Sequence, residues 1–160
     1  MPEIIPNLWF DGQAEEAARF YAGLFPNSQI DHIMHAPSDN PVASPGTVLY
    51  VEFTLNGQRY GAINGGPTFT LSEAISLVVA CQDQAEIDHY WDALGADGGT
   101  HSQCGWLKDR FGLSWQIQPA HMQRLVAGPS AEGSARAFQA MLGMTKLDIS
   151  ELEAAYAGPR

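Results

Sequence analysis

The chain has 160 residues, of which 45% are hydrophobic and 10% aromatic, enough for one globular domain or for two small modules that share a core. Its formal net charge of −10 argues against nucleic acid and anionic membrane as partners, because binding to either requires clustered Lys and Arg side chains. We therefore expect a small-molecule ligand, neutral or cationic, and no nucleic-acid or membrane partner.

The sequence predicts a cytoplasmic protein. The first residues lack the basic and long apolar regions of a secretory signal, and no window approaches the ~20 apolar residues of a membrane span. The two cysteines, Cys81 and Cys104, lie in strand-like contexts, which favours free thiols in a reducing compartment over a disulfide scaffold.

The first half of the chain alternates strand patterns with one helix pattern. An apolar stripe at helical spacing, from Ala17 to Leu24, predicts the helix, and Pro26 ends it. The Asn56-Gly57 dipeptide between two alternating segments predicts a hairpin. The proline-containing loop 36–46 is interpreted as flexible or as a lid. The predicted order is one strand, one helix and three strands, over residues 4–10, 13–25, 28–35, 47–55 and 58–64.

The same order begins again near residue 74. A capping-box pattern, Asp83 followed by Glu86, opens a second helix that ends at Gly95. An Asp-x-x-Gly turn, in which Gly112 can adopt the positive φ that the turn demands, joins the last two strands. The predicted strands and helix cover residues 74–81, 83–95, 97–103, 104–108 and 113–118.

The two halves of the chain repeat each other. Residues 84–86 repeat residues 13–15 at a distance of 71, and residues 111–116 superpose on 56–61 with the turn glycines aligned. One βαβββ module cannot bury both faces of its sheet, so two modules must cooperate to form a cavity. The predicted fold class is therefore α+β, with two βαβββ modules forming a curved mixed sheet around a central cavity, and with C-terminal helices.

The repeat also sets the expected boundaries within one structural domain. The first module covers residues 1–66, the second covers 67–119, and a C-terminal helical extension covers 120–160. Two alanine-rich segments of the extension, 131–142 and 149–157, are predicted helices that we interpret as packing or dimer elements. The last strand of the second module carries the candidate functional surface, because alternation places Ser114, Gln116 and Gln118 on one face.

Several segments of this chain resemble PhnB-like proteins of the glyoxalase, bleomycin-resistance and extradiol-dioxygenase superfamily, which has the vicinal oxygen chelate fold. Many such proteins carry the label 3-demethylubiquinone 3-methyltransferase-like. The matching segments are Leu8-Trp9-Phe10-Asp11-Gly12, Phe20-Tyr21, Asn64-Gly65-Gly66-Pro67, Ser76-Leu77-Val78-Val79, residues 104–116 and residues 141–146. The resemblance implies the paired-module fold. The methyltransferase label gains no support, because neither strand-to-helix turn is glycine-rich as a Rossmann-type donor site would require.

The resemblance also implies where a metal would bind. Catalytic members of the superfamily hold a divalent ion with His and Glu side chains at four equivalent strand positions, which align here with Ile5, Gly61, Ser76 and Gln116. Isoleucine and glycine side chains have no donor atom, and a divalent cation requires carboxylate or imidazole for tight binding. We therefore expect no metal and no other cofactor. The five histidines are scattered, and only His101 falls near the expected cavity.

Our leading hypothesis is a metal-free, homodimeric protein that binds a small molecule and has no assignable reaction or catalytic residue. The expected cavity is lined by Asn7, Trp9, Ser76, Trp106 and Gln116. The polar side chains among them would hydrogen-bond the ligand and the tryptophans would stack on it.

Two alternatives remain open. The protein could be a metal-dependent lyase, isomerase or dioxygenase whose ligands lie elsewhere, including on a second chain, or the cavity could be filled and the protein act through its dimer surface. Cys104 is interpreted as a structural thiol at the start of a strand, since the sequence shows no base to activate it.

Overall fold

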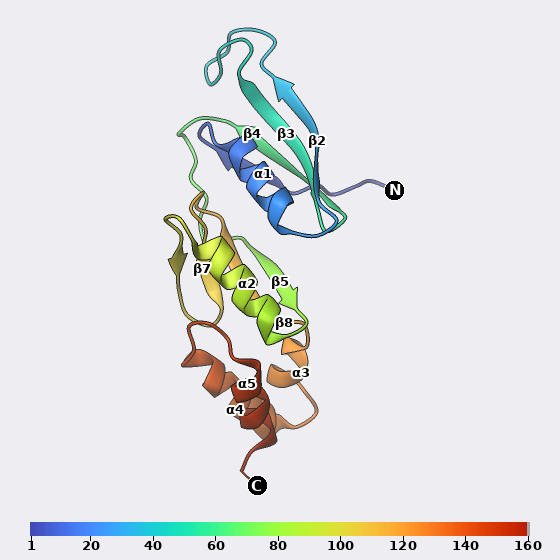
Figure 1. Cartoon of the computed structure of the whole chain (residues 1–160), viewed down its shortest axis with the longest axis vertical. Helices are drawn as coiled ribbons and strands as arrows, with labels where there is room; N and C mark the ends of the chain where they lie inside the picture. The colour runs from blue at the N-terminus through green and yellow to red at the C-terminus, as the bar shows by residue number, and fades with distance from the viewer. Residues whose placement is uncertain (160) are drawn as a thin grey trace. The chain divides into compact units, whose positions relative to one another are not determined.

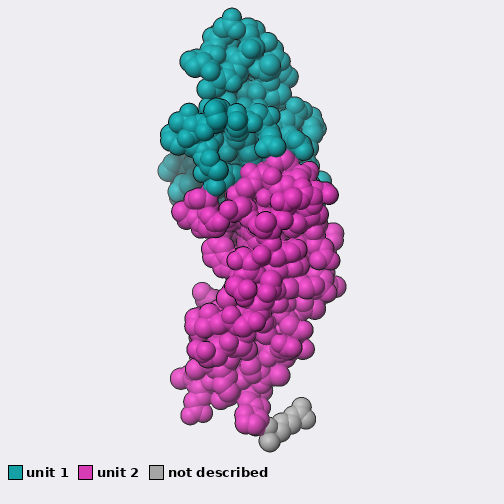
Figure 2. Space-filling model, turned by 90° about the vertical axis from the view of Figure 1, so that its left-hand side faces the viewer, with its two compact units in different colours: residues 1–71 teal, residues 72–160 magenta. Residues whose placement is uncertain are grey.

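The computed structural model describes residues 1–159, which form two compact units. The units are Met1–Leu71 and Ser72–Arg160 (Figure 2). Each contains its own four-stranded mixed sheet and helix, and the second also carries the C-terminal helices (Figure 1). The predicted α+β fold class is confirmed, whereas the module limits at residues 66 and 119 and the cavity between the modules stay predictions.

The first unit has one helix on one face of its sheet (Figure 1). Alternation along the strands buries Leu8, Phe10 and Val51 beneath the helix, where the ring of Tyr21 lies 6.4 Å from that of Phe53. The sheet order is β1-β4-β3-β2, with β1 and β4 parallel and the other pairs antiparallel. The elements are β1 (Asn7–Phe10), α1 (Ala14–Leu24), β2 (Gln29–His35), β3 (Val48–Leu55) and β4 (Gln58–Asn64).

The start of α1 is fixed by a buried side chain from the end of β4. The Asn64 Oδ1 atom accepts a hydrogen bond from the Ala14 backbone N–H at 2.9 Å, and its Nδ2 atom donates to the Val48 carbonyl at 3.0 Å. The first N–H groups of a helix have no partner within the helix, so this contact satisfies one of them. A single amide therefore joins the helix start to two strands.

The second unit repeats this arrangement. Its sheet order is β5-β8-β7-β6, again with the outer pair β5 and β8 parallel. The predicted N-cap is confirmed, since the Asp83 side chain accepts from the Glu86 N–H at 2.9 Å. The Glu86 carboxylate accepts from the Gln82 N–H at 2.8 Å, one residue before the N–H that a capping box uses. The elements are β5 (Ser76–Cys81), α2 (Gln84–Gly95), β6 (Thr100–His101), β7 (Trp106–Lys108) and β8 (Ser114–Pro119).

Strand register confirms the predicted repeat. Asn7 pairs with Gly61 in the first unit, and Val78 pairs with Gln116 in the second. The equivalent positions are 71 residues apart on the first strand of each module and 55 apart on the last. These are the separations that superpose the two halves of the sequence, so the modules share both topology and register.

The C-terminal helices form a separate small core. Met122, Leu125, Ala137, Leu147 and Leu152 are buried against one another. The predicted helices α4 (Ala131–Leu142) and α5 (Ile149–Ala157) are confirmed, and α3 (Met122–Val126) is a helix too short to show a sequence period. No helix within residues 1–159 is long and apolar enough to cross a membrane.

This extension is bonded to the second sheet unit. The Gln84 side chain at the start of α2 donates to the Leu147 carbonyl at 3.0 Å and accepts from the Ile149 N–H at 2.9 Å. The backbone N–H groups of Cys104 and Gly105 donate to the carbonyls of Met144 and Thr145, each at 2.8 Å. The extension therefore braces both the helix and the turn before β7.

Four predicted strands begin two or three residues too early. Cys104 and Gly105 have φ angles of 59° and 80°, so they form a turn, and β7 begins only at Trp106. Left-handed backbone cannot continue a strand. The other three are β1, which begins at Asn7 rather than residue 4, β5, which begins at Ser76 rather than residue 74, and β6, which begins at Thr100 rather than residue 97. Pro6 has no N–H for the ladder, although its carbonyl accepts from Gly61.

We predict that Gly105→Ala destabilises the protein far more than Gly12→Ala. Both glycines have positive φ, 80° and 87°, which costs a non-glycine residue about 1 kcal/mol. A Cβ at Gly105 would also lie 2.6 Å from the Ile117 carbonyl oxygen, whereas none of the described atoms lies within 4 Å of one at Gly12. We expect losses of about 3 and 1 kcal/mol, measured by urea unfolding. Equal losses would contradict this explanation.

We also predict that the two thiols differ in reactivity. Burial raises the pKa of the Cys81 thiol to about 12, and the carboxylates of Glu86 and Asp83 add to the shift, whereas Cys104 is half-buried. Because the thiolate is the nucleophile, iodoacetamide at pH 8 should alkylate Cys104 at least ~10 times faster than Cys81. Peptide mass spectrometry measures both rates. They should become equal in denaturant, and equal rates in the folded protein would refute the prediction.

The same shift makes stability depend on alkaline pH. Folding raises the pKa of Cys81, so the neutral thiol contributes fully to the free energy of unfolding when the pH is below the ordinary thiol pKa. This contribution to stability declines as the pH rises toward 12. Cys81→Ala should remove this part of the pH dependence of the unfolding free energy.

Candidate functional site

The face of the second sheet that points away from α2 carries polar side chains. Trp115, Ile117 and Leu107 are buried on the α2 side, so their strand neighbours point to the other face. We call this the polar face of the second sheet. It comprises Ser76, Val78, Trp106, Lys108, Ser114, Gln116 and Gln118.

Three of the five predicted site residues meet on this polar face. The Gln116 Nε2 atom donates a hydrogen bond to the Ser76 hydroxyl at 2.9 Å across the parallel pair β5 and β8. Trp106 lies directly opposite Gln116 in the antiparallel pair of β7 and β8, and it is half-buried. A hydroxyl, a primary amide and an indole therefore lie side by side on adjacent strands.

The other two predicted residues, Asn7 and Trp9, share one face of β1 in the first unit. Asn7 is exposed and lies over Gly61, where a Cβ would be 2.6 Å from the Asn7 Oδ1 atom. Trp9 is held by its own unit, because its indole N–H donates to the Gly66 carbonyl at 2.9 Å and its ring meets Phe69 edge-on at 4.9 Å. The Trp9 N–H is thus already engaged.

The four positions aligned with the superfamily's metal ligands do not suit a divalent ion. Ile5 and Gly61 offer no side-chain donor, and Ser76 and Gln116 are neutral and bonded to each other. Within residues 1–159, no group of three or more His, Cys, Asp or Glu side chains gathers closely enough to hold a metal. The donor set therefore offers hydrogen bonds rather than coordination.

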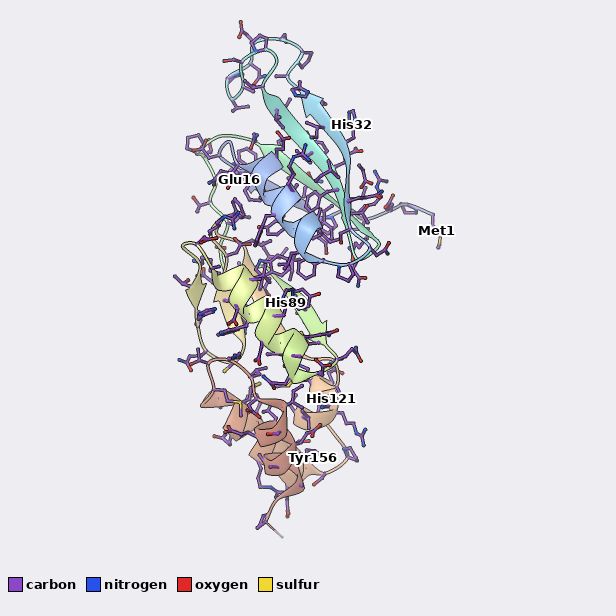
Figure 3. All side chains as sticks on the ribbon, in the orientation of Figure 1. Met1, Glu16, His32, His89, His121 and Tyr156 are labelled. Carbon is purple, nitrogen blue, oxygen red and sulfur yellow. The ribbon has the colours of Figure 1, made fainter. Side chains whose placement is uncertain are left out.

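The histidines lie at separate places on the fold, and the His89 ring meets Tyr90 edge-on with ring centroids 5.0 Å apart. His101 stacks on Trp91 with ring centroids 4.3 Å apart, and its Nε2 atom lies 3.1 Å from the Trp91 carbonyl, so it fastens β6 to α2. His121, at the start of α3, lies 3.1 Å from Glu153. His32 and His89 stand on β2 and α2 (Figure 3).

A cavity of about 480 Å³ adjoins the polar face in the second unit. Its lining includes Trp106, Lys108 and Ser114 from the polar face, together with Cys104 from the preceding turn and Glu73. The Lys108 ammonium lies 2.6 Å from a Glu73 carboxylate oxygen, and this hydrogen bond is the largest cause of the lowered pKa of Glu73. Sequence reasoning missed this pair, although strand alternation already places Lys108 opposite Ser114.

A second cavity, of about 560 Å³, lies in the first unit near the start of α1. Its lining includes Asp11, Glu15 and Asn64 and several residues between 42 and 48. The Asn64 side chain already has two backbone partners, so it presents no unused buried polar atom there.

Comparison with known structures supports the fold. The PhnB protein from Bacillus cereus is 36% identical over 72% of this chain and 98% of its own, with a TM-score of 0.65. PA1353 from Pseudomonas aeruginosa is 18% identical over 74% of this chain and 98% of its own, with a TM-score of 0.61. The fosfomycin resistance protein FosX from Listeria monocytogenes, complexed with Mn(II) and sulfate, is 11% identical over 76% and 92%, with a TM-score of 0.52.

The sequence comparison identifies the family. No curated protein matches the chain significantly. The family model described as 3-demethylubiquinone-9 3-methyltransferase matches residues 2–118, which include all but the first and last residue of the two predicted modules and every predicted site residue. Together with the identity to the Bacillus cereus protein, this match shows that the chain belongs to that family of PhnB-like proteins.

Proposed function

We propose that this protein binds a small, planar organic molecule on the polar face of the second sheet, without a metal. The observation that carries the proposal is the hydrogen bond from Gln116 to Ser76. The resemblance described above aligns these two positions with metal ligands of catalytic superfamily members. After this bond forms, the Ser76 O–H can still donate to a ligand and the Gln116 Oε1 atom can still accept from one. The pair thus offers one donor and one acceptor at adjacent points.

Trp106 supports the binding of a planar molecule. It lies opposite Gln116 in the strand register and is half-buried, so its ring can cover the flat surface of a ligand whose polar edge reaches Gln116. Sites for small molecules commonly combine apolar walls with a few placed polar groups. Asn7 and Trp9 of the first unit remain further candidates for ligand contact.

Neither a methyl transfer nor a metal-dependent reaction is part of this proposal. The turns from β1 to α1 and from β5 to α2 lack the glycine-rich sequence of a Rossmann-type donor site. FosX, whose structure contains Mn(II), shares only the fold with this chain, and one fold supports many activities. The site argues for recognition by hydrogen bonds and stacking.

Benzamide, a planar neutral probe, tests the proposal with ¹⁵N-labelled protein. We expect it to shift the resonances of the Gln116 side-chain amide and the Trp106 indole. Gln116→Ala should weaken binding about fivefold, since one hydrogen bond contributes ~1 kcal/mol. Gln139→Ala, which changes an exposed glutamine of α4 outside the sheet, is the matched control and should bind like the wild type.

Two results would count against the proposal. One is equal affinity of the wild type and Gln116→Ala for benzamide, or no shift at Trp106. The other is a stoichiometric divalent ion in protein purified without chelator, measured by elemental analysis, which would favour the metal-dependent alternative.

A further inference from the structure

The cavity beside the polar face contains a buried hydroxyl that lacks a partner. Ser114 is 1% exposed, and no hydrogen-bond partner for its Oγ atom is present among residues 1–159. Buried polar groups in folded proteins are almost always paired, because an unpaired one is costly. Ser114 lies in β8 between Ser76 of β5 and Lys108 of β7, on the polar face and in the cavity lining. Its hydroxyl is therefore placed to bond a molecule that enters the cavity.

A positive charge lies next to this hydroxyl. Lys108 is directly opposite Ser114 in the strand register, and among the described residues that line the cavity it is the sole Lys or Arg. Its ammonium contacts the Glu73 carboxylate, which comes from the segment just before β5. The Glu73 side chain is 64% exposed, and exposed ion pairs contribute little to stability. A ligand can therefore take the place of Glu73 at small cost.

The remaining lining also suits an anion. Thr100 and Ser102 line the cavity and carry hydroxyl groups, so they offer further donors beside Lys108. The net charge of −10 favours a neutral or cationic ligand. Screening limits the influence of distant charges to about 10 Å, so the groups within the cavity decide which charge it accepts.

We propose that the cavity receives the oxyanion of a small planar acid, with Lys108 as its counterion and the Ser114 hydroxyl as a donor to it. In the free protein the Glu73 carboxylate pairs with the Lys108 ammonium, and it moves away when the acid binds. The inference rests on the proposed function, because the planar part of the same molecule would lie on Trp106. The acid group is a carboxylate, phosphonate or phosphate, which share this chemistry.

Four aromatic probes of similar size test the charge preference. Benzoate and phenylphosphonate carry an oxyanion, benzamide is neutral and benzamidinium is cationic. We expect one or both anions to bind at least ~10 times more tightly than benzamide, with benzamidinium weakest, because charge-assisted hydrogen bonds are stronger than neutral ones. Dissociation constants are measured by NMR titration at about 0.1 M ionic strength, where distant charges are screened, and comparing the two anions distinguishes the acid groups.

Variants of the ion pair between Lys108 and Glu73 test the roles of these two residues. Lys108→Met should abolish the preference for the anion over benzamide, and Glu73→Gln should tighten benzoate about threefold by removing a competitor. Lys146 and Asp88 provide the matched control, since they form a 2.9 Å ion pair in which the lysine has the same 38% exposure as Lys108. Lys146→Met and Asp88→Asn should bind every probe like the wild type.

Ser114→Ala distinguishes a role of Ser114 in ligand binding from a role in protein stability. We expect it to weaken benzoate about fivefold while leaving the thermal unfolding temperature unchanged or higher, since it removes an unpaired buried hydroxyl. Unchanged benzoate affinity in this variant would overturn the role of Ser114.

The outcomes also distinguish the two proposals. If benzamide shifts Trp106 and Gln116 but benzoate and phenylphosphonate bind no more tightly, the oxyanion site is refuted and the proposed function stands. An anion preference that survives in Lys108→Met refutes the site as well. If none of the probes shifts Trp106 or Gln116, both proposals fail.

Discussion

Each unit depends on one helix packed against one face of a four-stranded sheet. Strand alternation directs Val51 and Phe53 toward α1 and Trp115 and Ile117 toward α2, and these side chains supply the apolar burial. Because the helices cover the apolar face of each sheet, the residues on the opposite face are not needed for apolar burial. The same constraint that folds each module thus leaves a face on which Ser76 and Gln116 can carry polar groups.

Elements with strong local signals could be predicted from the sequence. The limits of β4, α4 and α5 agree with the predicted ones, because Asn56-Gly57 and the cap at Ser130 mark the ends of clear periodic patterns. The repeat could also be predicted, since a repeated turn glycine fixes strand register. The turn at Cys104 could not, because a cysteine with positive φ gives no sequence signal and depends on carbonyls about 40 residues later in the chain.

The candidate site was predictable in part for a similar reason. Ser76, Trp106 and Gln116 meet because parallel and antiparallel pairing follow from the module topology. The contact between Glu73 and Lys108 and the unpaired Ser114 hydroxyl depend instead on side-chain positions that no pattern encodes. Strand alternation predicts which face a residue occupies, but it does not predict which side chains on that face contact each other.

The contact between the C-terminal extension and the turn at Cys104 shows that the cavity depends on residues that do not line it. Carbonyls of Met144 and Thr145 hold the backbone of the turn, and Cys104 of that turn lines the cavity. A segment of the extension can therefore shape a ligand site without contributing a side chain to it. A substitution that moves the backbone at residues 144 and 145 would alter ligand preference, and an inventory of lining residues would not reveal the cause.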